Sequence, residues 1–288
     1  MLYPLLFERN HHAALWGGEE WLVSGHHSSP SVIANGSLRG QTLEDVVKKH
    51  GRVLMGAKAP VPDKFPLLFK IIDAHDRLSV QVHPNDDTAS SVGGEPKTEM
   101  WYILDHHAPI YAGFKVGIAK TDVVNAICDG KVEELLNKLD MAPGRSLFIP
   151  GGQVHAIGEG SLIYEVQQSS DTTYRMYDWG RVGADGKPRT LHVQESLAVI
   201  DCSLPTPIPQ SEVNCSYFNF APWRLSSALD IPGDPDTFRV LYAAEGAILV
   251  KWDNGEIQLG KGCATLIPAN LSVRIEPDGS ALVLATSL

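Results

Sequence analysis

The sequence has few cysteines, no long hydrophobic run and no excess of basic residues, and each absence excludes a class of protein. Its four cysteines are scattered without a CxxC pair, so they indicate neither a disulfide framework nor a thiolate metal site. No apolar run approaches the ~18 residues of a membrane-spanning helix. The opening MLYPLLFERN is too short and too soon charged for a signal peptide. We therefore expect a soluble cytoplasmic protein without a membrane partner.

The charge balance is acidic, with 34 Asp and Glu against 24 Lys and Arg, a net charge of −10 and a pI of about 5.5. It argues against a nucleic-acid partner but allows a small basic pocket for an anionic ligand. With 288 residues, 26 glycines and 19 prolines, the chain is typical of a turn-rich protein that forms one large or two modest domains.

Side chains that can bind a metal stand at the ends of two predicted strands between residues 78 and 101. Residues 79–83 alternate polar and apolar, which predicts a strand with Gln81 and His83 on one face. A loop follows, and Glu99 then opens a buried apolar strand. Imidazole, carboxylate and amide groups suit zinc or another divalent first-row metal. Taken alone, the stretch also fits two unconnected strands whose polar residues face water.

A second histidine follows a proline–glycine turn further along the chain. Residues 144–155 read G-x5-P-x-G-x2-H, so a strand runs into the turn and His155 begins the next strand. Pro and Gly fix the turn, and strand pairing fixes the residue after it, which aims one imidazole. Together with Gln81, His83 and Glu99, it gives three or four convergent ligands, enough for a catalytic metal with an open position.

Residues 262–275 repeat this pattern without the histidine. Gly, Ile-Pro and a later Ile recur at the same spacing, and Val273 takes the place of His155. We infer two related β units of which only the first has metal ligands; a chance similarity between two strand–proline turns is the alternative. The Pro-rich segment 204–209 predicts the boundary, with a metal-binding catalytic domain at 1–203 and a smaller β domain without metal ligands at 204–288.

Most other segments predict short strands with Gly and Pro turns, typical of a β-sandwich or barrel. Helices are predicted after the cap formed by Thr42 and Asp45, over 121–139 with Thr121 as the cap and Gly130 separating two short helices, and over 192–200. Lys70 lies in an apolar strand, where it needs an anionic partner or an escape to water. It is therefore either a pocket residue or a snorkelling one.

Residues 165–181 are dense in hydrogen-bonding and charged groups. Glu165 shares a strand face with Gln167, and the loop beyond carries Arg175 and Arg181. Both arginines are anion-binding candidates because guanidinium matches phosphate bidentately. A structural pair between Asp171 and Arg175 explains the charge pattern equally well.

These motifs resemble a known family. G-x5-P-x-G-x2-H matches the second motif of the cupin superfamily, and QVHPNDD, KTEMWYIL, IPGGQVHAIGEG and EVQQSSDTTYRMYDWGR resemble type I mannose-6-phosphate isomerases of the short bacterial form. The resemblance spans about residues 65–200 and is looser at both ends. It implies a mainly β fold of two cupin-type jelly-roll units with a few short helices. Gln81, in place of the usual first histidine, and the long gap from His83 to Glu99 agree with this branch.

The resemblance also implies roles for individual residues. His83, Glu99 and His155, with Gln81 as a further ligand, would bind one zinc ion per chain, and Arg175, Lys97 and Glu165 would be catalytic. The implied reaction interconverts mannose 6-phosphate and fructose 6-phosphate through an enediol. Glu165 would transfer the proton or, alternatively, orient a metal ligand. The expected partner is a sugar phosphate, and the expected state is a monomer or weak homodimer.

Two other functions stay open from the sequence. A cupin dioxygenase would use His83, Glu99 and His155 as a facial triad around Fe(II). A non-catalytic sugar-binding cupin would keep the β units but would not need His155 for ligand affinity. For the phosphate of an isomerase substrate, Lys70 and Lys115 are candidates.

Overall fold

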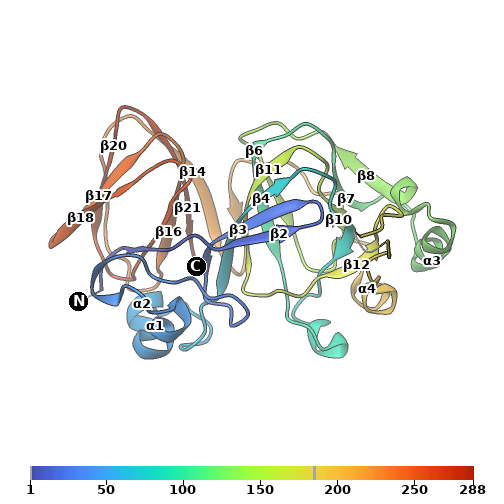
Figure 1. The fold of residues 1–288 in the computed structure, drawn as a ribbon, viewed down its shortest axis with the longest axis horizontal. Coiled ribbons are helices and arrows are strands. Elements are labelled where there is room, and N and C mark those ends of the chain that lie inside the picture. The colour runs from blue at the N-terminus through green and yellow to red at the C-terminus, as the bar shows by residue number, and fades with distance from the viewer. Residues whose placement is uncertain (1, 184–185) are drawn as a thin grey trace. The chain divides into compact units, whose positions relative to one another are not determined.

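The computed structural model describes residues 2–183 and 186–288, which are mostly strands (Figure 1). The chain forms two compact units. Unit 1 contains Met1–Asn10, Glu20–Phe69 and Ser211–Leu288, and unit 2 contains His11–Glu19 and Lys70–Gln210. Among the described residues, no helix is long and apolar enough to cross a membrane.

This division differs from the predicted domains at 1–203 and 204–288. Unit 2 ends at Gln210, one residue beyond the Pro-rich segment, but residues 1–10 and 20–69 lie with the C-terminal strands. One cause is strand pairing, since Leu5 pairs with Leu266 at the edge of a C-terminal sheet. Such a contact between distant segments leaves no local trace in the sequence.

Unit 2 is built on two sheets with apolar side chains between them. The first sheet has the order β12 (Tyr174–Tyr177), β5 (Val80–Val82), β10 (His155–Ala156), β7 (Ile110–Phe114) and β8 (Leu136–Leu139). The second has the order β2 (His11–Ala14), β3 (Gly17–Ser24), β4 (Leu67–Ala74), β11 (Ser161–Gln168), β6 (Glu99–Asp105) and β9 (Ser146–Ile149), with β3 and β4 continuing into unit 1. Residues of both sheets form one hydrophobic cluster, among them Ile103, Leu147 and Ile163 of the second sheet and Ile110 and Ala112 of the first.

Helices cover the other face of the first sheet (Figure 1). Val123 of α3 (Lys120–Asp129) and Val199 of α4 (Val193–Val199) share a buried cluster with Val80 and Val82 of β5. Two short 3-10 segments, Ala89–Val92 and Val132–Leu135, also belong to this unit. The helix predicted over 192–200 is thus confirmed within one residue at each end.

Of the two short helices predicted over 121–139, the first and the break at Gly130 are confirmed, whereas the second is only the 3-10 turn Val132–Leu135. The N-cap of α3 is Ala119 rather than Thr121, and the chain leaves the helix at Gly130, whose φ is +70°. Residues 136–139 instead form β8, which pairs with β7 through Ile110–Leu139 and Phe114–Leu136. Strand pairing thus overrides the local helical pattern at Leu136, which is buried, and at Leu139, which is partly buried.

Unit 1 also has two sheets. Their orders are β1 (Leu5–Leu6), β19 (Ala264–Ile267), β16 (Arg239–Glu245), β21 (Ala281–Ser287), β14 (Asn219–Leu225), β13 (Val213–Asn214), and β15 (Leu229–Ile231), β20 (Val273–Pro277), β17 (Ile248–Trp252), β18 (Gly255–Leu259). Gly36–Leu38 is a 3-10 turn, and α1 (Leu43–His50) and α2 (Arg52–Met55) follow. As predicted, Thr42 caps α1, since its hydroxyl accepts a hydrogen bond from Asp45 N at 3.1 Å.

The internal repeat of the sequence is confirmed by the strand pairing. In unit 2, β6 pairs with β9 and β11, and β10 pairs with β5 and β7. In unit 1, β16 pairs with β19 and β21, and β20 pairs with β15 and β17. The two units therefore share one strand arrangement, with His155 opposite Gln81 in one and Val273 opposite Ile231 in the other.

Candidate metal and catalytic site

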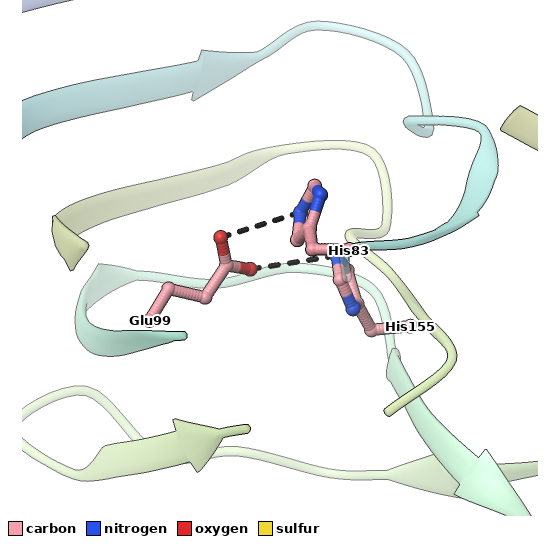
Figure 2. A group of neighbouring side chains, drawn as sticks. All are labelled: His83, Glu99 and His155. Carbon is pink, nitrogen blue, oxygen red and sulfur yellow. Dashed lines mark ion pairs between the residues drawn. The ribbon is translucent and has the colours of Figure 1, made fainter. Parts of the chain in front are cut away.

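Three predicted ligands meet inside unit 2 (Figure 2). His83 follows β5, Glu99 opens β6 and His155 opens β10, and their ligand atoms lie within 4.8 Å of one another. Nε2 of His83 is 3.4 Å from Oε2 of Glu99, and Nε2 of His155 is 3.4 Å from Oε1. All three side chains are at most 1% exposed.

Backbone carbonyls orient both imidazoles. Nδ1 of His83 is 2.9 Å from the carbonyl oxygen of Thr172, and Nδ1 of His155 is 2.9 Å from that of Gln153. Since a carbonyl only accepts, each Nδ1 carries a proton and each Nε2 presents its lone pair to Glu99. This is the orientation of metal-binding histidines whose second nitrogen donates to the backbone.

The electrostatics keep the three groups in their ligand forms. Burial, with the nearby ammonium of Lys97, lowers the pKa of His83 to about 3, and burial also lowers the pKa of His155. Burial alone would raise the pKa of Glu99, but the nearby ammonium of Lys97 holds it well below its usual range. Because the imidazoles are neutral, the contacts in Figure 2 bring lone pairs together rather than forming true ion pairs.

The carboxylate of Glu99 is the strongest indication that a cation belongs here. Neither of its oxygens accepts a well-formed hydrogen bond from any residue that the structure describes. The Lys97 ammonium approaches both Oε2 of Glu99 and Nε2 of His83, at 3.1 Å each. A buried carboxylate facing two nitrogen lone pairs is costly without a cation. The donor set of two imidazoles and one carboxylate therefore fits a divalent metal.

A proline–glycine turn ties the three ligand-bearing segments together. Gly152 N donates to the carbonyl of His83 at 2.7 Å, and Gly151 N donates to the hydroxyl of Thr98, next to Glu99, at 3.1 Å. A Cβ at Gly151 would lie 2.7 Å from the Cα of Asn85, so only glycine allows this backbone approach. The turn before His155 thus also fixes where His83 and Glu99 stand.

Gln81 and Arg175 lie in one row with His155. In the register of the sheet, His155 is opposite Gln81, and Gln81 is opposite Arg175 on its other side. Residues directly opposite share a face, so the three side chains point the same way. Nε2 of Gln81 lies 3.3 Å from Nε2 of His155. Gln81 therefore lies beside His155, and Arg175 occupies the next position of the same row.

The two predicted anion-binding arginines differ in their surroundings. Arg181 is held by Asp178 at 2.6 Å and by Asp76 at 2.9 Å, and its contacts are structural. Arg175 donates to the carbonyl of Thr190 at 2.9 Å and forms no pair with Asp171 in the described chain. Its Nε is buried without a partner among the described residues, and burial followed by the charge of Arg189 lowers its pKa. Nε of Arg181 also has no hydrogen-bond partner among the described residues, so the two arginines differ in that carboxylates pair with Arg181 and not with Arg175 in the described chain.

Glu165 lies on β11 opposite Trp101 of β6. Its Oε1 accepts a hydrogen bond from Nε1 of Trp101 at 3.0 Å, whereas its Oε2 has no hydrogen-bond partner among the described residues. Burial, reinforced by the charge of Glu99, raises the pKa of Glu165 to about 7. A carboxyl group with this pKa exchanges its proton at neutral pH.

Lys70 has the anionic partners that the sequence required. It is buried, with Nζ 3.0 Å from Oε2 of Glu19 and 3.7 Å from Oε2 of Glu165. Sequence reasoning missed Glu19, because in Glu19-Glu20 nothing local says which carboxylate faces inward. The other phosphate candidate, Lys115, is exposed and donates to the carbonyl of Glu134. The paired histidines at 11–12 and 26–27 do not belong to the ligand cluster.

A two-sheet β unit with a buried His, Glu and His cluster at its strand ends defines a cupin-type fold with a potential metal site. The family model for the catalytic domain of type I phosphomannose isomerase matches residues 12–124. The mannose-6-phosphate isomerase ManA of Bacillus subtilis is 37% identical over 260 residues, covering 79% of this chain and 81% of the relative. The mannose-6-phosphate isomerase of Streptococcus mutans is 32% identical over 318 residues, covering 99% and 98%. The chain belongs to the type I mannose-6-phosphate isomerase family.

Solved structures agree with this assignment. A crystal structure of the mannose 6-phosphate isomerase from Bacillus subtilis superposes with a TM-score of 0.89 at 29% identity and covers 100% of both chains. A mannose 6-phosphate isomerase solved in its zinc-bound form has a TM-score of 0.74 at 16% identity, covers 99% of both chains and shows the shared fold. The predicted family, the isomerase class and the mainly β fold are confirmed.

Proposed function

We propose that the protein interconverts mannose 6-phosphate and fructose 6-phosphate at this site. The observation that carries the proposal is the Glu99 carboxylate, which is buried without a bonded donor, faces two neutral imidazoles and lies near the proton-exchanging Glu165. Metal binding and proton transfer are the two capacities that an aldose–ketose isomerisation through an enediol needs. The sugar phosphate is the partner that the family implies.

Zinc is the metal that best suits the cluster. Two imidazoles and one carboxylate are a usual donor set for a catalytic zinc, and the nitrogen–oxygen separations here are 3.4 Å, each to a different oxygen of Glu99. This is the one cluster of its kind in the described chain, so we expect one zinc ion per chain. Rotating the amide of Gln81 would point its oxygen toward the cluster as a further ligand. When bound, zinc would polarise the sugar oxygens as a Lewis acid.

Glu165 is the proposed proton-transfer group. Its carboxylate would take the proton from C2 of the open-chain aldose, the O2–H proton would pass to O1, and the resulting Glu165 acid would return its proton to C1 to give the ketose. Trp101 holds Oε1 in place, so Oε2 is the oxygen that exchanges the proton. Among the described residues, Glu165 has no hydrogen bond to any proposed metal ligand. This supports a role in proton transfer over one of orienting a ligand.

Two cations complete the proposed machinery. Arg175 shares the sheet face of Gln81 and His155 and has a free guanidinium N–H, which would stabilise the negative oxygen of the enediolate. Lys97 stands at the ligand cluster, where its ammonium would balance the charge that develops between O1 and O2 during ring opening and isomerisation. Both groups would act on substrate oxygens rather than on carbon.

A coupled assay of the purified protein with mannose 6-phosphate tests the proposal. We expect activity that disappears after chelation and returns when zinc alone is added, with about one zinc per chain by elemental analysis. The same preparation should consume no oxygen. Oxygen consumption would instead indicate a dioxygenase. Full isomerase activity after verified removal of all metal would refute the proposal.

A further inference from the structure

One carboxylate beside the proposed machinery has no part in the reaction as described above. Nζ of Lys70, on β4, is 3.0 Å from Oε2 of Glu19, on β3, and 3.7 Å from Oε2 of Glu165, on β11. The Lys70 and Glu165 side chains are 5% and 3% exposed, whereas that of Glu19 is 21% exposed. All three residues belong to unit 2.

The lysine favours one of its two carboxylates. A separation of 3.0 Å is that of a charge-assisted hydrogen bond, and 3.7 Å is too long for one. Glu165 cannot simply move closer, because Trp101 N–H holds its Oε1. A buried ammonium needs a carboxylate partner, and Glu19 provides it. The result is that Oε2 of Glu165 keeps no hydrogen bond within the described residues.

We propose that Glu19 is a positioning residue, which holds the ammonium of Lys70 away from Glu165 so that Oε2 of Glu165 remains available to exchange a proton. The inference rests on the proton-transfer role proposed for Glu165. Without the Glu19 carboxylate, Glu165 would be the remaining carboxylate partner of Lys70 in this trio, and the ammonium of Lys70 would move across the 3.7 Å gap to form a direct ion pair with it.

The charges around Glu165 give the direction of the effect. Glu99 of β6 and Glu19 of β3 raise its pKa, and Lys97, just before β6, and Lys70 of β4 lower it. The imidazoles of His83 and His155 in the ligand cluster are neutral. Loss of Glu19 removes one raising charge and brings a lowering charge closer. An opposite charge in contact lowers a carboxyl pKa by about 1–3 units, so Glu165 would become a weaker base.

The test compares Glu19→Gln with Glu20→Gln in the metal-loaded enzyme. Glu20 is the matched control, since it is the next residue of β3, on the opposite face, and its Oε1 accepts from Asn10 N. We expect the acid limb of the kcat/KM profile to move down by about one pH unit or more in Glu19→Gln and to stay in place in Glu20→Gln. Glu19→Asp should rescue the profile in part. An acid limb of the kcat/KM profile at the same pH in Glu19→Gln and Glu20→Gln would overturn the inference.

Carbon-13 NMR of the carboxyl groups separates this inference from the proposed function. The titration midpoint of Glu165 should fall in Glu19→Gln, and the fall should shrink to less than half when Lys70→Met is present, because the effect acts largely through Lys70. An unchanged midpoint overturns the positioning role alone. A midpoint that falls while the rate profile stays in place overturns the role of Glu165 in the reaction.

Discussion

The two units place chemically opposite residues at equivalent positions of one strand arrangement. The register equates His155 with Val273, Gln81 with Ile231, Glu99 with Arg239, Trp101 with Leu241 and Glu165 with Ala285. In unit 1, Ile231, Leu241, Val273 and Ala285 belong to one hydrophobic cluster. In unit 2, three of these four positions hold the polar residues Gln81, His155 and Glu165, and the fourth, Trp101, belongs to a hydrophobic cluster.

This difference shows that the strand arrangement does not depend on the polar residues of the site. Four apolar residues at these positions gain stability from burial, at about 25 cal/mol per Å² of apolar area. Their polar counterparts lose hydration and need partners instead. The strand arrangement therefore positions side chains, and a few substitutions decide whether the interior is a hydrophobic core or a reactive site.

The largest effect is expected when the proposed metal ligand His155 of unit 2 is replaced by the valine that unit 1 has at the equivalent position. His155→Val should remove the metal and lower kcat/KM by at least about 10³-fold, since a Lewis-acid metal contributes several kcal/mol to such a transition state. Elemental analysis and the coupled assay measure the two losses, and circular dichroism checks the fold. A variant that keeps its metal and its activity would contradict the assignment of His155.

The next largest effect should come from Glu165→Gln, which keeps the shape of the side chain and its bond from Trp101. We expect kcat to fall by about 10²-fold or more, the usual contribution of a general base, with unchanged metal content. The retained metal distinguishes this loss from that of His155→Val. Undiminished turnover in this variant would assign the proton transfer to another group.

The reverse substitution, Val273→His, should damage stability rather than activity. The imidazole would enter an apolar cluster without a designed acceptor, at a cost of about 2–3 kcal/mol in the free energy of unfolding. Because no catalytic side chain belongs to unit 1, kcat should stay within the error of the assay. Urea unfolding measures the cost, with Val273→Ile as the size control. A stability equal to that of the control would mean that this core tolerates polar groups.

The smallest effect concerns pH. Proton abstraction needs the Glu165 carboxylate, and burial raises its pKa to about 7, so the ionised fraction and the rate fall as pH drops through this value. Between about pH 7.5 and about pH 6.5, kcat/KM should fall about threefold. A rate profile flat down to about pH 5.5 would show that a group with an ordinary carboxyl pKa carries the proton.

Much of the site could be predicted because its signals are local. The alternation around Gln81 and His83 and the turn before His155 are short-range patterns, and the same turn recurs before Val273 without the ligand. The features of the site that could not be predicted from the sequence depend on pairing between distant strands. The row that joins Arg175 to Gln81 exists only through the register of β12 with β5.

The errors have the same origin. Leu136 and Leu139 fit a helical pattern, and only β7 determines that they lie in a strand. Glu19 and Glu20 are identical neighbours, and only the buried ammonium of Lys70 distinguishes them. A helix cap such as Thr42, which depends on residues three positions away, was correct.

The backbone approach at Gly151 has a consequence for the exchange of the metal. Unit 1 has Ala269 at the equivalent position, where no ligands need to be held together. In unit 2, main-chain contacts at Gly151 set the spacing of the proposed ligands. The methyl group of an alanine there would move the ligands apart without changing any ligand side chain. Gly151→Ala should therefore speed the dissociation of the metal, and the half-life of the ion on the protein would measure how rigid this turn is.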